Sequence, residues 1–200
     1  MANYQKVIDV FKKNYKLVPL EFYGHDPYKT LISTLLSSRT KDDLTLKISK
    51  KIFKKASNIK KLDDLTESQI RDFIYPVGFY KTKAKYLKRL SKMVLNEFGG
   101  RIPNNRDDLM KLPGVGRKTA NLVLNRAFKE SAIAVDTHVH RITNILGWVN
   151  TKTPEQTEMV LNKTLPKKYW ADLNRLFVSI GQQYRSERKL REFLKENKLI

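Results

Sequence analysis

One lysine stands where helix electrostatics disfavour a cation. The stretch LPGVGRKTANLVLN, residues 112–125, begins with a Pro-Gly-Val-Gly turn and continues with a strongly helical pattern. This places Arg117 and Lys118 in the first turn of a helix, at the positive end of its macrodipole. Stability alone favours Asp, Ser or Glu at such positions. Lys118 is therefore a candidate functional residue.

Residue type and position leave three roles open for Lys118. It is a solvated surface cation, a contact to a phosphate group, or a nucleophile. Helical spacing groups Lys118 with Asn121 and Asn125 on a polar face. The apolar side of the same helix consists of Ala120, Val123, Leu124 and Ala127. A nucleophilic lysine attacks carbon through its neutral amine, and a helix N-terminus disfavours the charged form.

The segment before Lys118 predicts a tight hairpin with an exposed backbone. Gly114 and Gly116 permit positive φ and carry no side chain, so backbone N–H groups beside the helix N-terminus can face outward. Such a geometry binds a phosphate group without reference to base identity. Ordinary helix–helix turns also use Gly and Pro, so the hairpin gains weight only together with the charge of the chain.

Charge is the strongest feature of the composition. The 200 residues contain 40 Lys and Arg against 20 Asp and Glu, a formal net charge of +20. A surplus of this size favours a polyanionic partner, which inside a cell is usually nucleic acid. Solubility through charge, or a compositional bias of the source, is the alternative. The cations lie in segments with helical patterns rather than in a detachable tail, which favours nucleic acid.

The composition also excludes several kinds of site. With no cysteine, these residues cannot form disulfides, thiolate nucleophiles, zinc–thiolate sites or cysteine-ligated iron–sulfur clusters. No apolar run reaches about 18 residues, so we expect no membrane span. The N-terminal stretch MANYQKVIDV lacks the pattern of a signal peptide, so we expect an intracellular protein, cytoplasmic or, as the alternative, nuclear.

Asp136 is a second candidate, with a structural explanation beside the functional one. It follows the apolar run AIAV and precedes a helical stretch that starts at Thr137, so capping that helix is sufficient reason for an Asp. A functional carboxylate would need to face cationic chemistry in a cleft. His138 and His140 are two residues apart and point to different helix faces, which argues against a metal site and for polar contacts or surface imidazoles.

Apolar residues recur at helical spacing along nearly the whole chain. Clear helix starts are Asp26 before Pro27 and the capping box from Thr66 to Gln69. Further starts are expected at Asn105 and at Thr153-Pro154. The segment SAIAVD, residues 131–136, is the nearest approach to a strand. We therefore predict an all-α fold of about ten helices, large enough for one domain or two small ones.

Together these motifs resemble the signature of the endonuclease III family of helix-hairpin-helix DNA glycosylases. LPGVGRKTANLVLNRAF and IAVDTHVHRI carry the resemblance, which extends to LISTLLSSRTKD, GFYKTKAKYL and GGRIPNNRDDLMKL. It covers the chain from about Thr30 to Gly181. The resemblance implies two helical domains with a cleft between them. One is a six-helix domain at 21–131 with the helix-hairpin-helix motif at about 106–128, and the other combines 1–20 with 132–200.

The resemblance also implies roles for single residues. Lys118 falls on the catalytic lysine of the family, whose amine attacks the sugar C1′ of an extruded nucleotide, expels the damaged base and forms a Schiff base before β-elimination. Asp136 falls on the catalytic aspartate, which supports positive charge at the sugar and proton transfer. The implied DNA contacts are Arg39, Gly114, Val115, Gly116, Arg117 and His138.

Two departures from the family pattern affect these expectations. Most family members carry four cysteines near the C-terminus that bind an iron–sulfur cluster, whereas Arg185 stands about where the first would be. A cluster-free variant without a cofactor is therefore expected, although family hairpins often hold a monovalent cation through backbone carbonyls. The second departure is Arg39, since many bacterial relatives have a glutamine there that fills the gap left by the flipped base. The preference for the opposite base therefore stays open.

The function expected first is a bifunctional DNA repair glycosylase with abasic-site lyase activity on oxidised pyrimidines such as thymine glycol. It would act as a monomer on double-stranded DNA with damaged bases or abasic sites. Uracil or thymine opposite guanine is the second substrate class on the same scaffold. The adenine-removing branch lacks a lysine at this position and fits less well. A non-catalytic DNA-binding module is the alternative from another class, and Lys118 and Asp136 together argue against it.

Overall fold

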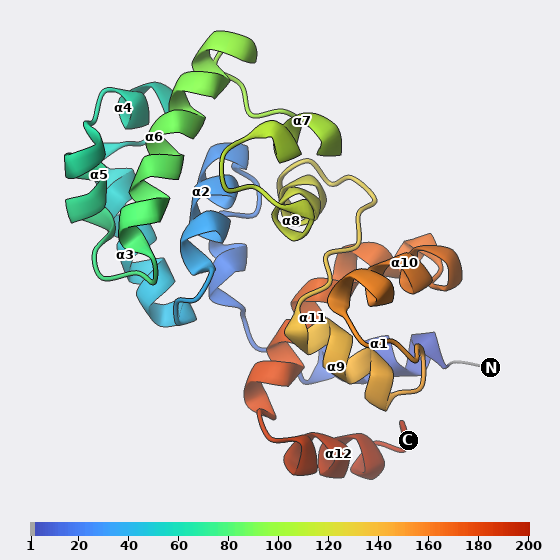
Figure 1. Ribbon diagram of the computed structural model, residues 1–200. Helices are drawn as coiled ribbons and strands as arrows, with labels where there is room; N and C mark the ends of the chain where they lie inside the picture. The colour runs from blue at the N-terminus through green and yellow to red at the C-terminus, as the bar shows by residue number, and fades with distance from the viewer. Residues whose placement is uncertain (1–2) are drawn as a thin grey trace. The chain divides into compact units, whose positions relative to one another are not determined.

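The computed structural model describes residues 3–200, which form twelve α-helices and two short 3₁₀ helices (Figure 1). No β-strand occurs in this range, so the all-α prediction is confirmed. The chain divides into two compact units. The central unit runs from Pro19 to Glu130, and the terminal unit combines the segment up to Val18 with Ser131–Ile200. No helix among the described residues is long and apolar enough to cross a membrane.

The central unit is built around one buried helix. Its elements are η1 (Pro19–Tyr23), α2 (Pro27–Ser37), α3 (Asp42–Lys55), α4 (Ile59–Asp63), α5 (Glu67–Ile74), α6 (Tyr80–Glu97), α7 (Arg106–Lys111) and α8 (Arg117–Ala127). Helix α2 lies between α3 and α6 on one side and α8 on the other (Figure 1). Eight of its eleven residues are buried, three of them polar (Thr30, Ser33 and Thr34), because neighbouring helices cover α2 on both sides. Its C-terminal end leads directly into the turn that carries Arg39.

The predicted helix starts in this unit are confirmed. The Asp26 carboxylate accepts a hydrogen bond from the Lys29 amide at 3.0 Å, with Pro27 in the first turn. The capping box of α5 has both of its bonds, since the Gln69 amide donates to Thr66 Oγ1 and the Gln69 side chain accepts from the Thr66 amide. Local capping residues therefore determine where both helices begin.

The terminal unit contains α1 (Tyr4–Lys13), α9 (Thr137–Ile145), α10 (Pro154–Thr164), η2 (Lys167–Tyr169), α11 (Trp170–Gln183) and α12 (Glu187–Glu196). Helix α11 contacts α1, α9 and η2, and α10 contacts α9. The rings of Phe11 and Phe177 meet edge to face with centroids 4.9 Å apart. The aromatic and aliphatic side chains of these helices form a core of their own.

The structure adds elements that the sequence analysis did not predict. Helix α4 spans five residues, too few to show a helical period. Helix α12 places Leu190, Phe193 and Leu194 in the core, and these apolar residues recur at helical spacing. The ambiguous segment SAIAVD is buried from Ala132 to Val135 and forms no strand. The carbonyl oxygen of Ala134 accepts instead from the side-chain amide of Asn174, at 3.0 Å.

Candidate active site

The hairpin between α7 and α8 has the predicted tight turn. The amide of Val115 donates to the carbonyl of Leu112 at 3.0 Å, which closes the turn. Gly114 has φ +81°, and a Cβ built on it would lie 2.7 Å from Cδ2 of Tyr86. Both the backbone conformation and the close approach of Tyr86 therefore require glycine at this position.

Gly116 is explained by neither of these reasons. It is the N-cap of α8, with φ −94° and ψ 176°, values that any residue can adopt. A Cβ built on it would meet no atom within 4 Å. Gly116 also has no side-chain oxygen to accept from the first-turn amides of α8. This helix N-terminus is thus accessible to an anion from outside the molecule, as a phosphate contact requires.

Gly116→Ser should separate this function from stability. A serine cap accepts from the amides that a phosphate would otherwise use, so the free energy of unfolding should rise by a few tenths of a kcal/mol. The affinity for duplex DNA should fall about tenfold, because a hydrogen bond to a charged group is lost. Denaturant unfolding and fluorescence anisotropy measure the two effects. Asn58→Ser, which exchanges one cap for another at α4, is the control, and unchanged affinity in Gly116→Ser would contradict the anion site.

Lys118 lies in the first turn of α8 and its side chain is exposed, as is that of Arg117. The predicted polar face of α8 is partly wrong. Asn121 is fully buried, and its Oδ1 accepts from Nε of Arg106 at 2.8 Å. This bond joins α7 to α8 and fixes the hairpin between them. Asn121 therefore shares the predicted face with Lys118 by its spacing, but its side chain serves a structural bond.

Arg39 is exposed and adopts φ +54°, which is unusual for a residue with a side chain. The turn that holds it, residues 38–40, follows the end of α2. The Thr40 amide donates to Ser37 O, and Thr40 Oγ1 accepts from the Gly78 amide, both at 3.0 Å. A Cβ built on Gly78 would lie only 2.2 Å from the carbonyl oxygen of Arg39. Position 78 must therefore be glycine, because any side chain there would collide with the backbone of this turn.

Lys83 is a buried cation that the sequence analysis missed. Only 7% of its surface is exposed, and Nζ donates to Leu36 O at 2.8 Å, to Ser38 O at 2.6 Å and to Thr40 Oγ1 at 3.4 Å. Burial lowers the pKa of Lys83 to about 8, while the oxygen acceptors favour the ammonium. A signal existed in the sequence, because Lys83 shares helical spacing with Leu87 and Leu90 on the apolar stripe of α6.

The lowered pKa of Lys83 predicts how stability depends on pH. Between about pH 8 and pH 10 the unfolded chain binds more protons at this residue than the folded chain, so the free energy of unfolding rises with pH. Relative to Lys83→Met, the wild type should gain about 1–3 kcal/mol over this range. Guanidinium unfolding at several pH values measures the difference. Lys85→Met, which removes an exposed lysine of α6, should show no such change relative to wild type, and a constant difference for Lys83→Met would contradict the lowered pKa.

In the terminal unit, Asp136 is the N-cap of α9, as predicted. Its Oδ1 accepts from the amides of His138 and Val139 at 3.0 and 2.9 Å. The side chain is half-buried, and both bonds use the same oxygen. Capping therefore leaves Oδ2 outside these two bonds, and a second role for the carboxylate is compatible with the geometry.

The two histidines of α9 differ in their surroundings. The ring of His138 lies so close to Gly181 of α11 that a Cβ there would be 2.3 Å from its Nδ1. The ring of His140 is held by Thr157 Oγ1 at 2.7 Å from Nδ1, a structural polar contact. Within residues 3–200, no group of three or more His, Cys, Asp or Glu side chains is placed to hold a metal ion.

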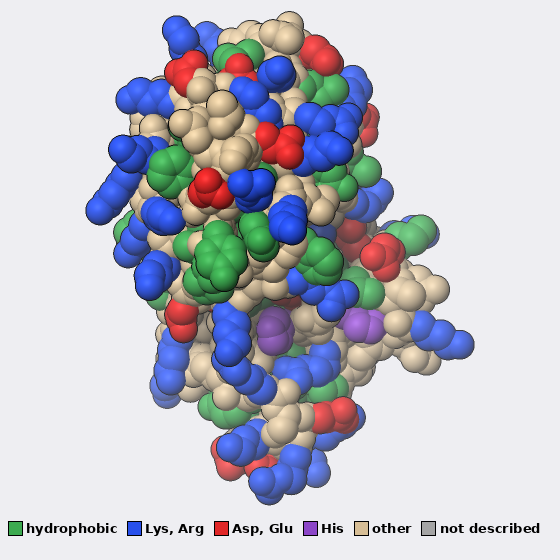
Figure 2. All heavy atoms as spheres, turned by 60° about the vertical axis from the view of Figure 1, so that its left-hand side comes forward, with side chains coloured by type: hydrophobic (Ala, Val, Ile, Leu, Met, Phe, Trp, Pro, Cys, Tyr) green, Lys and Arg blue, Asp and Glu red, His purple; other side chains and the backbone are tan. Residues whose placement is uncertain are grey.

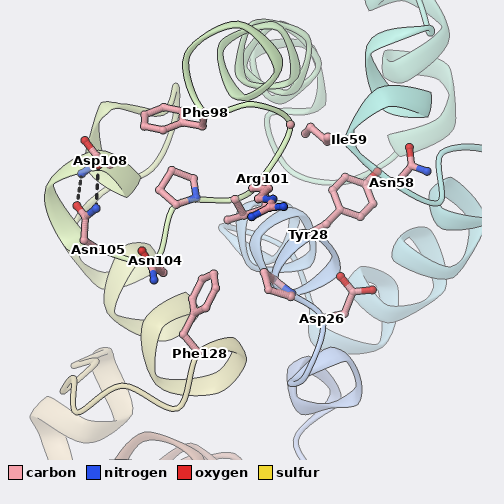
Figure 3. A pocket seen from close by; sticks show the side chains of 14 residues that line it. Asp26, Tyr28, Asn58, Ile59, Phe98, Arg101, Asn104, Asn105, Asp108 and Phe128 are labelled. Carbon is pink, nitrogen blue, oxygen red and sulfur yellow. Dashed lines mark hydrogen bonds between the residues drawn. The ribbon is translucent and has the colours of Figure 1, made fainter.

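The central unit also contains a hollow of about 630 Å³, whose lining does not indicate a catalytic site (Figure 3). Tyr28, Phe98 and Phe128 line it with rings. Several polar groups in its wall are already hydrogen-bonded at helix N-termini. The side chain of Asn105, for example, caps α7 and also donates to the Asp108 carboxylate. Asp26 and Asn58 cap α2 and α4 in the same way. The hollow is thus mainly an apolar space among helix ends.

The surface is basic over a wide area. Figure 2 shows Lys and Arg side chains across most of the visible face, with fewer Asp and Glu between them. Some of the cations are paired, as Arg188 with Glu192 and Arg191 with Glu187 on α12. A distributed positive field of this kind suits the backbone of a nucleic acid more than a single small anion.

Comparisons with known proteins point in the same direction. Residues 32–167 match the model of the HhH-GPD superfamily base excision DNA repair proteins. Endonuclease III of Thermotoga maritima is 43% identical over 179 residues, which cover 90% of this chain and 81% of that protein. The solved structure of a trapped endonuclease III–DNA covalent intermediate, an estranged-adenine complex, matches with a TM-score of 0.74 at 34% identity, covering 79% of this chain and 75% of the other. A thermostable thymine-DNA glycosylase matches with a TM-score of 0.80 at 26% identity, covering 92% and 87%.

Proposed function

Because the chain belongs to the endonuclease III family within the HhH-GPD superfamily of base excision DNA repair proteins, we propose that it is a bifunctional DNA glycosylase and abasic-site lyase. The observation that supports this most directly is an exposed lysine, Lys118, directly after a hairpin whose Gly116 is open to an approaching phosphate. A DNA strand gripped there brings its sugars close to the first turn of α8.

The proposed reaction begins with base flipping, which takes the damaged nucleotide out of the stack. The neutral amine of Lys118 forms a bond to the sugar C1′ while the bond from C1′ to the base breaks, and the base leaves with the bonding electrons and takes up a proton. The bond from C1′ to the ring oxygen O4′ then breaks and O4′ takes up a proton, which opens the sugar and leaves a protonated Schiff base between Lys118 and C1′. β-Elimination removes a proton from C2′ and expels the 3′ phosphate, which breaks the strand on the 3′ side.

Asp136 supports this reaction through charge and proton transfer in our proposal. Its carboxylate stabilises positive charge that develops at the sugar, and Oδ2 lies outside the two capping bonds. The proposed DNA contacts are Arg39, His138, Arg117 and the hairpin of Gly114, Val115 and Gly116. Since the amide of Val115 closes the turn and its side chain is buried, we assign the phosphate grip mainly to Gly116 and the first-turn amides of α8.

We propose oxidised pyrimidines, such as thymine glycol, as the bases that are removed. A second candidate is uracil or thymine opposite guanine, which the similarity to a thymine-DNA glycosylase favours. Arg39 is proposed to enter the space left by the flipped base and to hydrogen-bond the orphan base, which makes the opposite base a determinant of activity. In either case the substrate is double-stranded DNA, and we propose that the protein acts as a monomer.

The test is a panel of duplexes that differ in one base pair. Each carries thymine glycol, uracil or thymine against adenine or guanine, and base release and strand nicking are measured separately at one salt concentration. We expect release of thymine glycol together with nicking, and nicking of a preformed abasic site. Release only of uracil and thymine opposite guanine would favour the second candidate. Tight binding with neither release nor nicking would leave a DNA-binding module.

A further inference from the structure

We propose that Lys83 is a positioning residue for Arg39, because its buried ammonium fastens the turn that presents the arginine. The inference rests on the role proposed for Arg39 in the space left by a flipped base. Lys83 itself lies in the core and contacts the turn from α6, a helix that is separate in sequence from α2.

The contacts of Lys83 span the end of α2 and the turn that follows. Leu36 O belongs to the last turn of α2, whose carbonyls have no amide partner within the helix. Ser38 O and Thr40 Oγ1 lie on the two sides of Arg39. A cation near a helix C-terminus is also favoured by the helix dipole. Lys83 thus acts as a C-terminal cap of α2 supplied from α6, and it also hydrogen-bonds to both neighbours of Arg39.

The conformation of Arg39 needs such support. A residue with a side chain at φ +54° persists only where its surroundings impose that conformation. Gly78 supports it, since its missing Cβ leaves room for the carbonyl oxygen of Arg39, and its amide donates to Thr40 Oγ1. Lys83 supports the same turn through its bonds to Ser38 O and Thr40 Oγ1. Thr40 Oγ1 joins the two, because it accepts from Gly78 and from Lys83.

An apolar side chain would be the ordinary choice for the place that Lys83 occupies. Its position on α6 continues the stripe of Leu87 and Leu90, and burying an ammonium is costly unless every donor finds an acceptor. The three acceptors all belong to the end of α2 and the turn. The buried charge is therefore explained by the turn that it holds, and that turn carries one exposed long side chain, Arg39.

The experiment compares Lys83→Met with Lys85→Met, which removes an equal charge from the exposed side of the same helix. The readout is the rate of lesion excision divided by the rate of nicking at a preformed abasic site. Arg39→Ala and Lys83→Met should each lower this ratio roughly tenfold, the size of effect expected for losing hydrogen bonds to a charged group. Lys85→Met should keep the ratio of the wild type.

A double variant separates positioning from general damage. In the Arg39→Ala background, Lys83→Met should change the ratio by less than about twofold, because the side chain that it positions is gone. The proposal would be overturned if the two substitutions lowered the ratio independently, so that their effects multiply in the double variant. Equal losses of rate on lesion and abasic substrates in Lys83→Met would also overturn it. Where Lys83→Met does not fold, Thr40→Val takes its place, since it removes only the hydroxyl shared by Gly78 and Lys83, and the same two outcomes decide.

Hydrogen exchange tests the fastening without reference to activity. The Thr40 amide bonds to Ser37 O and the Gly78 amide bonds to Thr40 Oγ1, so both should exchange roughly tenfold faster in Lys83→Met than in Lys85→Met. Faster exchange with an unchanged activity ratio in Arg39→Ala would show that Lys83 holds the turn but that the role proposed for Arg39 is wrong. Unchanged exchange at both amides would overturn the proposal for Lys83.

Discussion

Lys118→Gln should abolish the covalent protein–DNA adduct that borohydride traps during reaction with an abasic-site duplex. Borohydride reduces the Schiff base to a stable amine, and glutamine has no amine that can form one. The variant should still bind the duplex, because Gly116 and the first-turn amides of α8 keep their geometry. The adduct is measured by denaturing gel electrophoresis, and we expect no band above background.

The fold should tolerate this change well. Lys118 is exposed at the positive end of α8, so removing its charge should leave the stability equal or slightly higher. Arg117→Gln is the matched control, since it removes a cation from the same turn and should still give the adduct while it weakens DNA binding. An adduct with Lys118→Gln would make another amine the nucleophile. Loss of adduct and binding together, in a folded protein, would return Lys118 to a phosphate contact.

Local signals in the sequence predicted most of the helices. A cap followed by an apolar period is a short-range feature, so Asp26-Pro27 and the Thr66–Gln69 box specify their helices almost alone. The helix-hairpin-helix motif was expected to end at about residue 128, and α8 ends at Ala127. Helix α4 lacked such a signal, because five residues cannot show a period.

The missed residues of the site depend on contacts between distant segments. Lys83 bonds to atoms 43–47 residues away in the sequence. Gly78 leaves room for the carbonyl oxygen of Arg39, 39 residues before it. Composition and spacing identify neither contact. Asn121 shows the opposite failure, since its type suggested an exposed position while Arg106 satisfies it in the core. Polar residues that are buried, such as Lys83 and Asn121, are therefore the positions where a sequence prediction most needs tertiary structure.

Asp136→Asn should lower the rate of base release by two or more orders of magnitude in a normally folded protein. Asparagine is as good an N-cap as aspartate, and its Oδ1 can accept from the amides of His138 and Val139 as the carboxylate does. Only the negative charge and the proton acceptor are removed. A general acid–base or electrostatic role is typically worth about 10²–10⁴ in rate. Single-turnover excision under enzyme excess measures the effect, with circular dichroism as the check on folding.

Two further variants show whether the cap or the charge is responsible. Asp26→Asn makes the same chemical change at the N-cap of α2 and should keep nearly full activity. Asp136→Ala removes cap and carboxylate together, so it should lose about 0.5–2 kcal/mol of stability in addition to activity. If Asp136→Asn folds and excises at a rate near that of the wild type, the carboxylate has no catalytic role. The aspartate would then be present only because α9 needs a cap, which the two bonds to Oδ1 already explain.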